Sequence, residues 1–329
     1  MPRSSRRGGP LSDVSPVLLR EMATLYYKDD ITQAEIAQRF GMSRPGVSRM
    51  LAEARRRGIV RIEIPPLHDT LDEGLAERLC SALGLNRVLL AEESPPAVRG
   101  STLAPVLADA LQEVGLRRGS VVVLSTGRTI YETITSQVPS LPGITVVPAV
   151  GGQGEPEAWY QANELTRHMA NNCGGHPEFL YAPAMPGPQL YATLLDDPAT
   201  SHVIDLWSKA DVALLGIGAP PHTRSTIASD IPLRDPRLAS AVGDVCLHFF
   251  DIEGKAVDFE GSDRILGTPV STLKTIPSAI ALAVGPDKAP SIVGAARGGY
   301  MNELITDSTT ALAVLALLER ASDLEGGEN

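Results

Sequence analysis

The sequence of 329 residues has few cysteines and no apolar run long enough to cross a bilayer. Its three cysteines, Cys80, Cys173 and Cys246, lie far apart and show no Cys-x-x-Cys spacing, which argues against a disulfide framework and a zinc site. The basic first ten residues are not followed by the apolar core of a secretion signal. We therefore expect a cytoplasmic protein that has no membrane partner.

The net charge of −10 is unevenly distributed along the chain. Residues 1–64 hold 12 Lys and Arg against 7 Asp and Glu, whereas residues 65–329 hold 17 against 32. A basic segment joined to an acidic one is typical of a nucleic-acid-binding module attached to a separate domain. Part of the positive charge lies in residues 1–14, which show no periodicity and are expected to form a flexible tail.

A winged helix-turn-helix is predicted for residues 15–65. Its expected elements are helices over 15–29, 32–41 and 43–58 and a short strand over 59–64. Thr32 and Glu35 have the spacing of a capping box, and glycines end the second and third helices. The basic outward face of the third helix agrees with this arrangement.

The third helix is the one expected to enter the major groove of DNA. Its candidates for reading base edges are Arg44, Ser48 and Arg49, because Arg is the commonest partner of guanine in that groove. The candidates for contacts to phosphates and for support of the helix are Gln33, Ser43, Arg55, Arg56 and Arg61. For any single arginine, a merely solvated side chain is the alternative. The expected partner is double-stranded operator DNA.

Residues 66–84 are expected to form a connecting helix, and residues 85–329 a separate α/β domain. Hydrophobic residues make up 43% of the chain, enough for a large core. Strands are predicted at 88–91, 120–124, 144–148, 179–182, 212–217, 245–250 and 279–284, and helices at 98–114, 129–137 and 309–321. Apolar strands that alternate with amphipathic helices indicate a Rossmann-like fold, a mostly parallel sheet with helices on both faces.

One turn between a predicted strand and a predicted helix has the chemistry of an anion site. Ser125, Thr126, Gly127, Arg128 and Thr129 offer hydroxyls, free backbone N–H groups and a guanidinium, which suit a phosphate. Ligands of open α/β sheets lie beyond the carboxyl ends of the strands, where this turn is expected. A plain turn without a ligand is the alternative for this local pattern.

Further candidates follow other strands of the same sheet. Lys288 lies just after a predicted strand, where its ammonium group would meet a ligand anion; an exposed lysine is the alternative. Arg224 lies in a loop and is a candidate for another anion contact. Asp244 would either accept hydrogen bonds from sugar hydroxyls or only cap its own loop.

The chain resembles the SorC family of bacterial sugar-sensing transcriptional regulators. The motifs that carry this resemblance, in chain order, are Gln33-Ala34-Glu35-Ile36-Ala37, Val47-Ser48-Arg49-Met50-Leu51, Gly58-Ile59-Val60, Gly127-Arg128-Thr129, Gly151-Gly152, Gln161-Ala162-Asn163, Gly216-Ile217-Gly218, Ala241-Val242-Gly243-Asp244 and Leu304-Ile305-Thr306-Asp307. They cover nearly the whole chain, from about residue 15 to 320. The resemblance implies a regulator that forms a dimer or tetramer and whose operator affinity is controlled by a sugar or sugar phosphate.

The same resemblance implies the fold and the site of the effector domain. The fold would be that of ribose-5-phosphate isomerase and glucosamine-6-phosphate deaminase. The residues that it places at the effector are Gly151, Gly152, Gln161, Asn163, Gly216, Gly218 and Lys288, although Pro286 replaces a glycine usual before this lysine. Members that sense a bisphosphate tend to carry an arginine where this chain has Val150, so a monophosphate or an uncharged sugar is expected.

The sequence has little of what an enzyme of this fold would need. Its six histidines are scattered, and neither a metal-ligand cluster nor a nucleophile elbow is present. Asp211 and Asp244 are possible bases, yet nothing pairs them. We therefore expect no catalytic residues, no metal and no cofactor. The alternative is a sugar-phosphate isomerase or deaminase with an appended helix-turn-helix, which a turnover assay would reveal.

Overall fold

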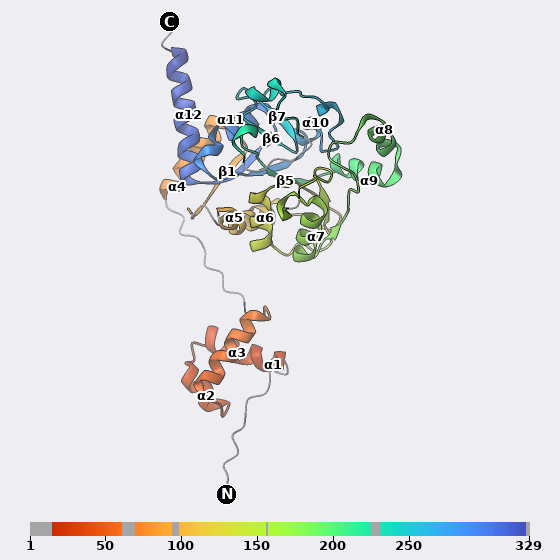
Figure 1. Cartoon of the computed structure of the whole chain (residues 1–329). Helices are drawn as coiled ribbons and strands as arrows, with labels where there is room; N and C mark the ends of the chain where they lie inside the picture. The colour runs from red at the N-terminus through yellow and green to blue at the C-terminus, as the bar shows by residue number, and fades with distance from the viewer. Residues whose placement is uncertain (1–14, 61–69, 94–98, 156, 225–230, 327–329) are drawn as a thin grey trace. The chain divides into compact units, whose positions relative to one another are not determined.

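The computed structural model describes residues 15–60, 70–93, 99–155, 157–224 and 231–326. The contacts divide the chain into two compact units, within residues 1–67 and 68–329. Figure 1 shows the helices and strands that make up each unit.

The first unit consists of three helices, α1 (Pro16–Tyr27), α2 (Gln33–Arg39) and α3 (Arg44–Arg56). Their apolar faces meet in a small core that consists of Leu19, Met22, Ala23, Ile36, Ala37, Val47, Leu51 and Ala54. The capping box predicted for α2 is present, since Thr32 Oγ1 accepts the Glu35 N–H at 3.3 Å and Glu35 Oε2 accepts the Thr32 N–H at 3.0 Å. These contacts confirm the helix-turn-helix.

The strand predicted for residues 59–64 does not begin where it was expected. Ile59 and Val60 form a bend, because both of their N–H groups donate to the Ala54 carbonyl and fold the chain back on the end of α3. Gly58, with φ of +69°, permits this reversal. The remainder of the predicted wing, including Arg61, lies outside the described residues.

The second unit is an α/β domain. Its strands are β1 (Arg87–Ala91), β2 (Val121–Leu124), β3 (Thr145–Pro148), β4 (His176–Pro177), β5 (Val212–Gly216), β6 (Gly243–Val245), β7 (His248–Phe250), β8 (Ser278–Leu282) and β9 (Glu303–Asp307). Its α-helices are α4 (Thr70–Leu83), α5 (Arg99–Val114), α6 (Arg128–Ser136), α7 (Ala162–Cys173), α8 (Pro188–Asp196), α9 (Pro198–Trp207), α10 (Val270–Leu273), α11 (Ala289–Gly298) and α12 (Ser308–Gly326). Short 3₁₀ turns are η3 (Ala158–Tyr160), η4 (Pro221–Thr223), η5 (Pro236–Ser240), η6 (Ser262–Arg264) and η7 (Pro286–Lys288).

Seven of these strands form one sheet in the order β1-β9-β8-β5-β2-β3-β4. Every pairing in this sheet is parallel; in the centre, for example, Val122 pairs with Val146 on one side and with Val212 on the other. The prediction of a mostly parallel sheet is therefore confirmed. Strands β6 and β7 form a separate antiparallel hairpin.

Helices cover both faces of the sheet, as the buried side chains show. In β2, Val121 and Val123 belong to one apolar cluster and Val122 and Leu124 to the other. The first cluster includes residues of α4, α9, α11 and α12, and the second includes residues of α5, α6 and α7 (Figure 1). Alternate residues of each strand thus point to opposite layers of helices, which explains the continuous apolar runs in the sequence.

Two predicted strands are wrong. Residues 179–182 form no strand, because the Asn163 side chain, rather than a neighbouring strand, bonds the Leu180 backbone N–H and carbonyl, each at 3.1 Å. Residues 245–250 do not form one strand either. Cys246 and Leu247 have φ of +51° and +67°, so the chain reverses there and β6 pairs with β7.

Candidate functional site

The outer face of α3 carries the side chains predicted to read DNA. Arg44, Ser48 and Arg49 are exposed on its N-terminal half, whereas Val47 and Leu51 are buried against the other helices. In a helix-turn-helix this half of the second helix approaches base edges. The structure therefore exposes the three side chains on this half of α3, and their role in reading base edges stays a prediction.

The C-terminal half of α3 contains a carboxylate that binds two of its arginines. Glu53 is only 5% exposed; its Oε1 accepts hydrogen bonds from Arg56 Nη2 and Arg57 Nε, both at 2.5 Å. These two guanidinium groups, Arg56 first, lower the pKa of Glu53 to about 2. Arg55 is exposed and has no ion-pair partner among the described residues. The two predicted phosphate contacts, Arg55 and Arg56, therefore differ in their surroundings.

Two other predicted DNA residues lie at helix starts. Ser43 caps α3, because its Oγ accepts the Gly46 N–H at 3.3 Å. Gln33 is the first residue of α2 and is half-buried. Both therefore lie at positive ends of helix dipoles, where backbone N–H groups attract phosphates.

In the second unit, the strand order reverses between β2 and β5. From β2 the chain proceeds to β3 and β4 on one side, and then to β5, β8 and β9 on the other. Such a switch point opens a crevice beyond the carboxyl ends of the two strands, where ligands of open α/β sheets bind. Here the buried Ser125 joins the two strands, because its Oγ accepts the Gly216 N–H at 2.7 Å.

Helix α6 begins at this switch point, directly after Gly127. Gly127 has φ of +132°, a conformation that residues with side chains rarely adopt, and no side chain caps the helix. Its N–H donates to the Trp159 carbonyl at 2.9 Å, and none of the described residues accepts the N–H groups of Arg128 or Thr129. Two N–H groups at the positive end of a helix are thus left for an anion.

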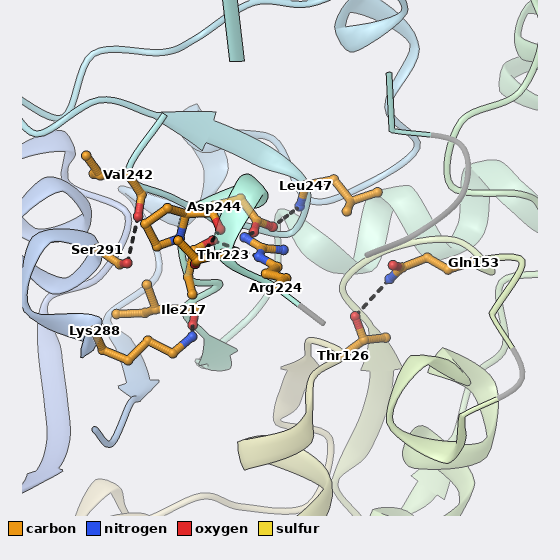
Figure 2. Close-up of polar contacts among 12 residues, drawn as sticks. Thr126, Gln153, Ile217, Thr223, Arg224, Val242, Asp244, Leu247, Lys288 and Ser291 are labelled. Carbon is orange, nitrogen blue, oxygen red and sulfur yellow. Dashed lines mark hydrogen bonds and ion pairs between the residues drawn. The ribbon is translucent and has the colours of Figure 1, made fainter. Parts of the chain in front are cut away.

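Side chains around this helix start are held from two directions. Arg128 Nε donates to Glu132 Oε1 at 2.8 Å, and its guanidinium lies 5.9 Å from the Trp159 ring centroid. Gln153 Nε2 donates to Thr126 Oγ1 at 2.9 Å (Figure 2). The η3 turn that contains Trp159 therefore covers part of the predicted phosphate site.

Asp244 and Arg224 form an ion pair next to the end of β5. Gly218 lies directly against the pair, and a Cβ at Gly218 would overlap both side chains. The Gly218 N–H also donates to the Asp244 carbonyl at 2.9 Å, so the hairpin that carries Asp244 is joined to the β5 end. The structure therefore brings three predicted residues, Gly218, Arg224 and Asp244, into one cluster. Figure 2 shows the side chains of Arg224 and Asp244.

Lys288 extends toward the same cluster from η7. Its Nζ donates to the Ile217 carbonyl at 2.7 Å (Figure 2). Burial and, next, the positive charge of Arg224 lower the pKa of Lys288, which is about 8 although Asp244 and Asp287 act in the opposite direction. A desolvated ammonium group next to a guanidinium favours an anionic ligand.

The remaining predicted residues make contacts within the protein. Gln161 Nε2 donates to the Glu155 carbonyl at 2.5 Å, and the Asn163 amide holds Leu180. Gly151 allows close packing, because a Cβ there would lie 2.7 Å from the Ala182 carbonyl oxygen, and the Gly152 N–H donates to that carbonyl. Their predicted role at the effector stays a prediction.

Several residues at this site carried no sequence signal. Gln153 and Trp159 contact the start of α6 although they are distant from it in sequence, so no local sequence pattern predicts these contacts. The turn at Cys246 and Leu247 contains neither Gly nor Asn, the residues that normally mark it.

The fold and the site together define a DNA-binding module joined to a ligand-binding α/β domain. Among the described residues, no helix has the length and apolarity to cross a membrane, and no group of three or more His, Cys, Asp or Glu is placed to hold a metal ion. A ligand-responsive transcriptional regulator is the class of protein that has this organisation.

Comparison with known proteins identifies the family. A sugar-binding domain family matches residues 70–316, and the MarR family of helix-turn-helix proteins matches residues 19–69. The sorbitol operon regulator of Klebsiella pneumoniae is 30% identical over 313 residues, which cover 91% of this chain and 97% of that protein. The transcriptional regulator LsrR of Escherichia coli (strain SMS-3-5 / SECEC) is 31% identical over 306 residues, covering 89% and 93%.

A solved structure agrees with these relatives. The full-length sorbitol operon regulator SorC from Klebsiella pneumoniae superimposes with a TM-score of 0.73 at 27% identity, over 92% of this chain and 100% of that one. The chain therefore belongs to the SorC family of sugar-binding transcriptional regulators. The family consists of regulators of transcription and not of enzymes.

Proposed function

We propose that the regulator binds a sugar monophosphate at the β2/β5 switch point and that this ligand controls its affinity for operator DNA. The observation that carries the proposal is that three cationic groups, Arg128, Arg224 and Lys288, follow the carboxyl ends of the neighbouring strands β2, β5 and β8, where α6 starts without a side-chain cap. Anions bind where backbone N–H groups and such side chains meet.

The roles of the residues follow from their chemistry. The N–H groups of Arg128 and Thr129, with the hydroxyls of Thr126 and Thr129, would hold phosphate oxygens. Lys288 supplies a positive charge to the same ligand. Asp244, as a carboxylate, accepts hydrogen bonds from sugar hydroxyls.

A single phosphate fits this site better than two. Val150 is completely buried, in an apolar cluster with Leu238 and Phe249. A second phosphate near this position would have to lose its hydration without gaining a cationic partner, which costs several kcal/mol. We therefore infer that a monophosphate binds more tightly than the corresponding bisphosphate.

The DNA side of the proposal uses α3. Arg44, Ser48 and Arg49 would read base edges, while Gln33, Arg55 and Arg56 contact phosphates. We infer that the protein acts in the cytoplasm as a homo-oligomer, a dimer or tetramer, because pairing of two DNA modules lets them bind repeated half-sites together. The ligand changes DNA affinity only through its different affinities for the two arrangements of the oligomer.

The test is fluorescence anisotropy with labelled DNA from upstream of the protein's own operon, titrated with sugar phosphates, sugar bisphosphates and free sugars. We expect sequence-preferring binding that one monophosphate shifts. Lys288→Met should retain DNA binding but lose the response to the ligand, and Asp235→Asn, outside the site, should retain both. DNA binding that no compound shifts would contradict the effector role, and a stronger effect of a bisphosphate would contradict the assignment of Val150.

A further inference from the structure

The carboxylate of Asp244 has both of its oxygens in use. Oδ1 accepts a hydrogen bond from Arg224 Nη2, and Oδ2 accepts the Leu247 N–H at 3.1 Å (Figure 2). The side chain is only 9% exposed, so water does not replace either partner easily. A sugar hydroxyl therefore meets a buried carboxylate whose two oxygens already have partners while this arrangement persists.

Arg224 also has more than one partner. Besides its pairing with Asp244, its Nε donates to the Ala219 carbonyl at 2.7 Å, and its guanidinium lies 5.8 Å from the Phe249 ring centroid. Its side chain is 16% exposed. The guanidinium that would bind an effector anion is thus neutralised by a carboxylate of the same chain.

The two partners are not equally fixed. Asp244 is a residue of strand β6 and is fixed by two contacts: its backbone carbonyl accepts the Gly218 N–H after β5, and its side chain accepts the Leu247 N–H in the hairpin turn. Arg224 directly follows the three-residue turn η4 and is attached to the cluster through its side chain. A change of partner is therefore made by the Arg224 side chain, while Asp244 stays in place.

We propose that Asp244 and Arg224 form a latch, which an anionic effector opens by replacing the Asp244 carboxylate as the partner of the Arg224 guanidinium. This inference rests on the proposed function and concerns the control of the same site. Once the exchange has occurred, Asp244 keeps the Leu247 N–H and has one oxygen that needs a new donor. A sugar hydroxyl supplies that donor.

The latch explains how the site distinguishes a sugar phosphate from its two parts. A free sugar has no negative charge with which to displace a carboxylate from a guanidinium. Inorganic phosphate displaces it but leaves one buried oxygen of the Asp244 carboxylate without its charged donor, which is unfavourable. Only a molecule that places a sugar hydroxyl beside Asp244 while its anion holds Arg224 restores every contact that it breaks.

The experiment measures binding of inorganic phosphate and of a sugar monophosphate panel by calorimetry, in phosphate-free buffer, with the full chain. In Asp244→Asn the competing charge is gone, and we expect inorganic phosphate to bind about tenfold more tightly than to the wild type. The advantage of a sugar phosphate over inorganic phosphate should shrink at the same time. Adding Arg224→Gln should remove the gain.

The controls distinguish a failure of the latch from a failure of the proposed ligand site. Asp235→Asn removes the carboxylate of another Asp–Arg pair, the one with Arg237, and should leave all affinities unchanged. If Asp244→Asn does not fold, Asp244→Ser retains an acceptor for the Leu247 N–H and carries the same expectation. Inorganic phosphate that binds these variants no more tightly than it binds the wild type overturns the latch. Failure of every sugar phosphate to bind, with no gain for inorganic phosphate in the variants, overturns the proposed function as well.

Discussion

The backbone N–H of Gly127 donates to the carbonyl of Trp159 at 2.9 Å, so the η3 turn occupies a donor at the start of α6. Trp159 also lies against Arg128 and within 6.4 Å of the Tyr131 ring, between centroids. A phosphate at the α6 start would compete with the Trp159 carbonyl for the Gly127 N–H. We therefore expect ligand binding at this site to be coupled to the position of Trp159.

We predict that the effector changes the fluorescence of Trp159. The chain has two tryptophans, and the other, Trp207, is 2% exposed and donates to the Pro148 carbonyl, so its emission should stay constant. Emission should shift to the red and acrylamide quenching should increase as the effector is added. Trp159→Phe should lose this response, and a response of full size in that variant would show that η3 does not move.

Lys288 should make effector binding sensitive to pH. A bound phosphate stabilises the ammonium form of Lys288. Without ligand, this ammonium group loses its proton above about pH 8, so Lys288 must take up a proton when phosphate binds there. We expect affinity to fall about tenfold between pH 7 and pH 9, measured by calorimetry.

Lys288→Arg is the matched control for this titration. A guanidinium does not titrate in this range, so the variant's affinity should vary little between pH 7 and pH 9. An equally steep pH profile in Lys288→Arg would assign the titration to another group. Folding stability depends on pH in the opposite direction to ligand affinity. The unfolded chain binds the Lys288 proton more tightly than the folded one, so between about pH 8 and 10.5 this lysine makes the free energy of unfolding rise with pH.

The helix-turn-helix could be predicted closely because its signals are local. Thr32 and Glu35 make the hydrogen bonds that their spacing implies, and the three helices occur where the caps and glycines indicate. The parallel sheet was equally predictable, since runs such as 121–124 are apolar at every position and are buried on both faces. In both cases residues close in sequence carry the information.

Features that depend on distant partners could not be predicted. The Asn163 amide bonds Leu180, 17 residues away, within an apolar stretch for which the sequence predicts a strand. The Arg224–Asp244 pair joins residues 20 apart, and only the fold brings them together. The turn at Cys246 is stabilised by the Asp244 side chain rather than by a glycine, so its sequence resembles a strand.

Ser125 should matter for stability as well as for position. Ser125 is 2% exposed and its hydroxyl accepts the Gly216 N–H, so Ser125→Ala leaves this part-buried donor without its partner. We expect a loss of about 1–3 kcal/mol in the free energy of unfolding, measured by denaturant titration. Ser240→Ala, which alters an exposed hydroxyl, should cost less than about 0.5 kcal/mol. Equal losses in the two variants would mean that the bond to Gly216 contributes nothing.

Glu53 should weaken the contribution of α3 to DNA binding. It pairs with Arg56 and Arg57, while Arg55 has no such partner among the described residues. A cation that already has a carboxylate partner adds less to the attraction of DNA phosphates than one that has none. In a salt series measured by anisotropy, we expect Arg55→Ala to reduce the slope of log affinity against log salt by about 1, and Arg56→Ala to reduce it by less.

Glu53→Gln provides the converse test. The variant removes the negative charge but retains an acceptor for the two guanidinium groups, so affinity for random-sequence DNA should rise at low salt, and the salt slope should become steeper. Sequence preference should not improve, because Arg49, the candidate for base reading, is on the other half of the helix. Thermal unfolding of the Glu53→Gln variant, compared with the wild type, checks that α3 is still folded. If Glu53→Gln binds random DNA no more tightly than the wild type, Arg56 and Arg57 do not face the phosphates.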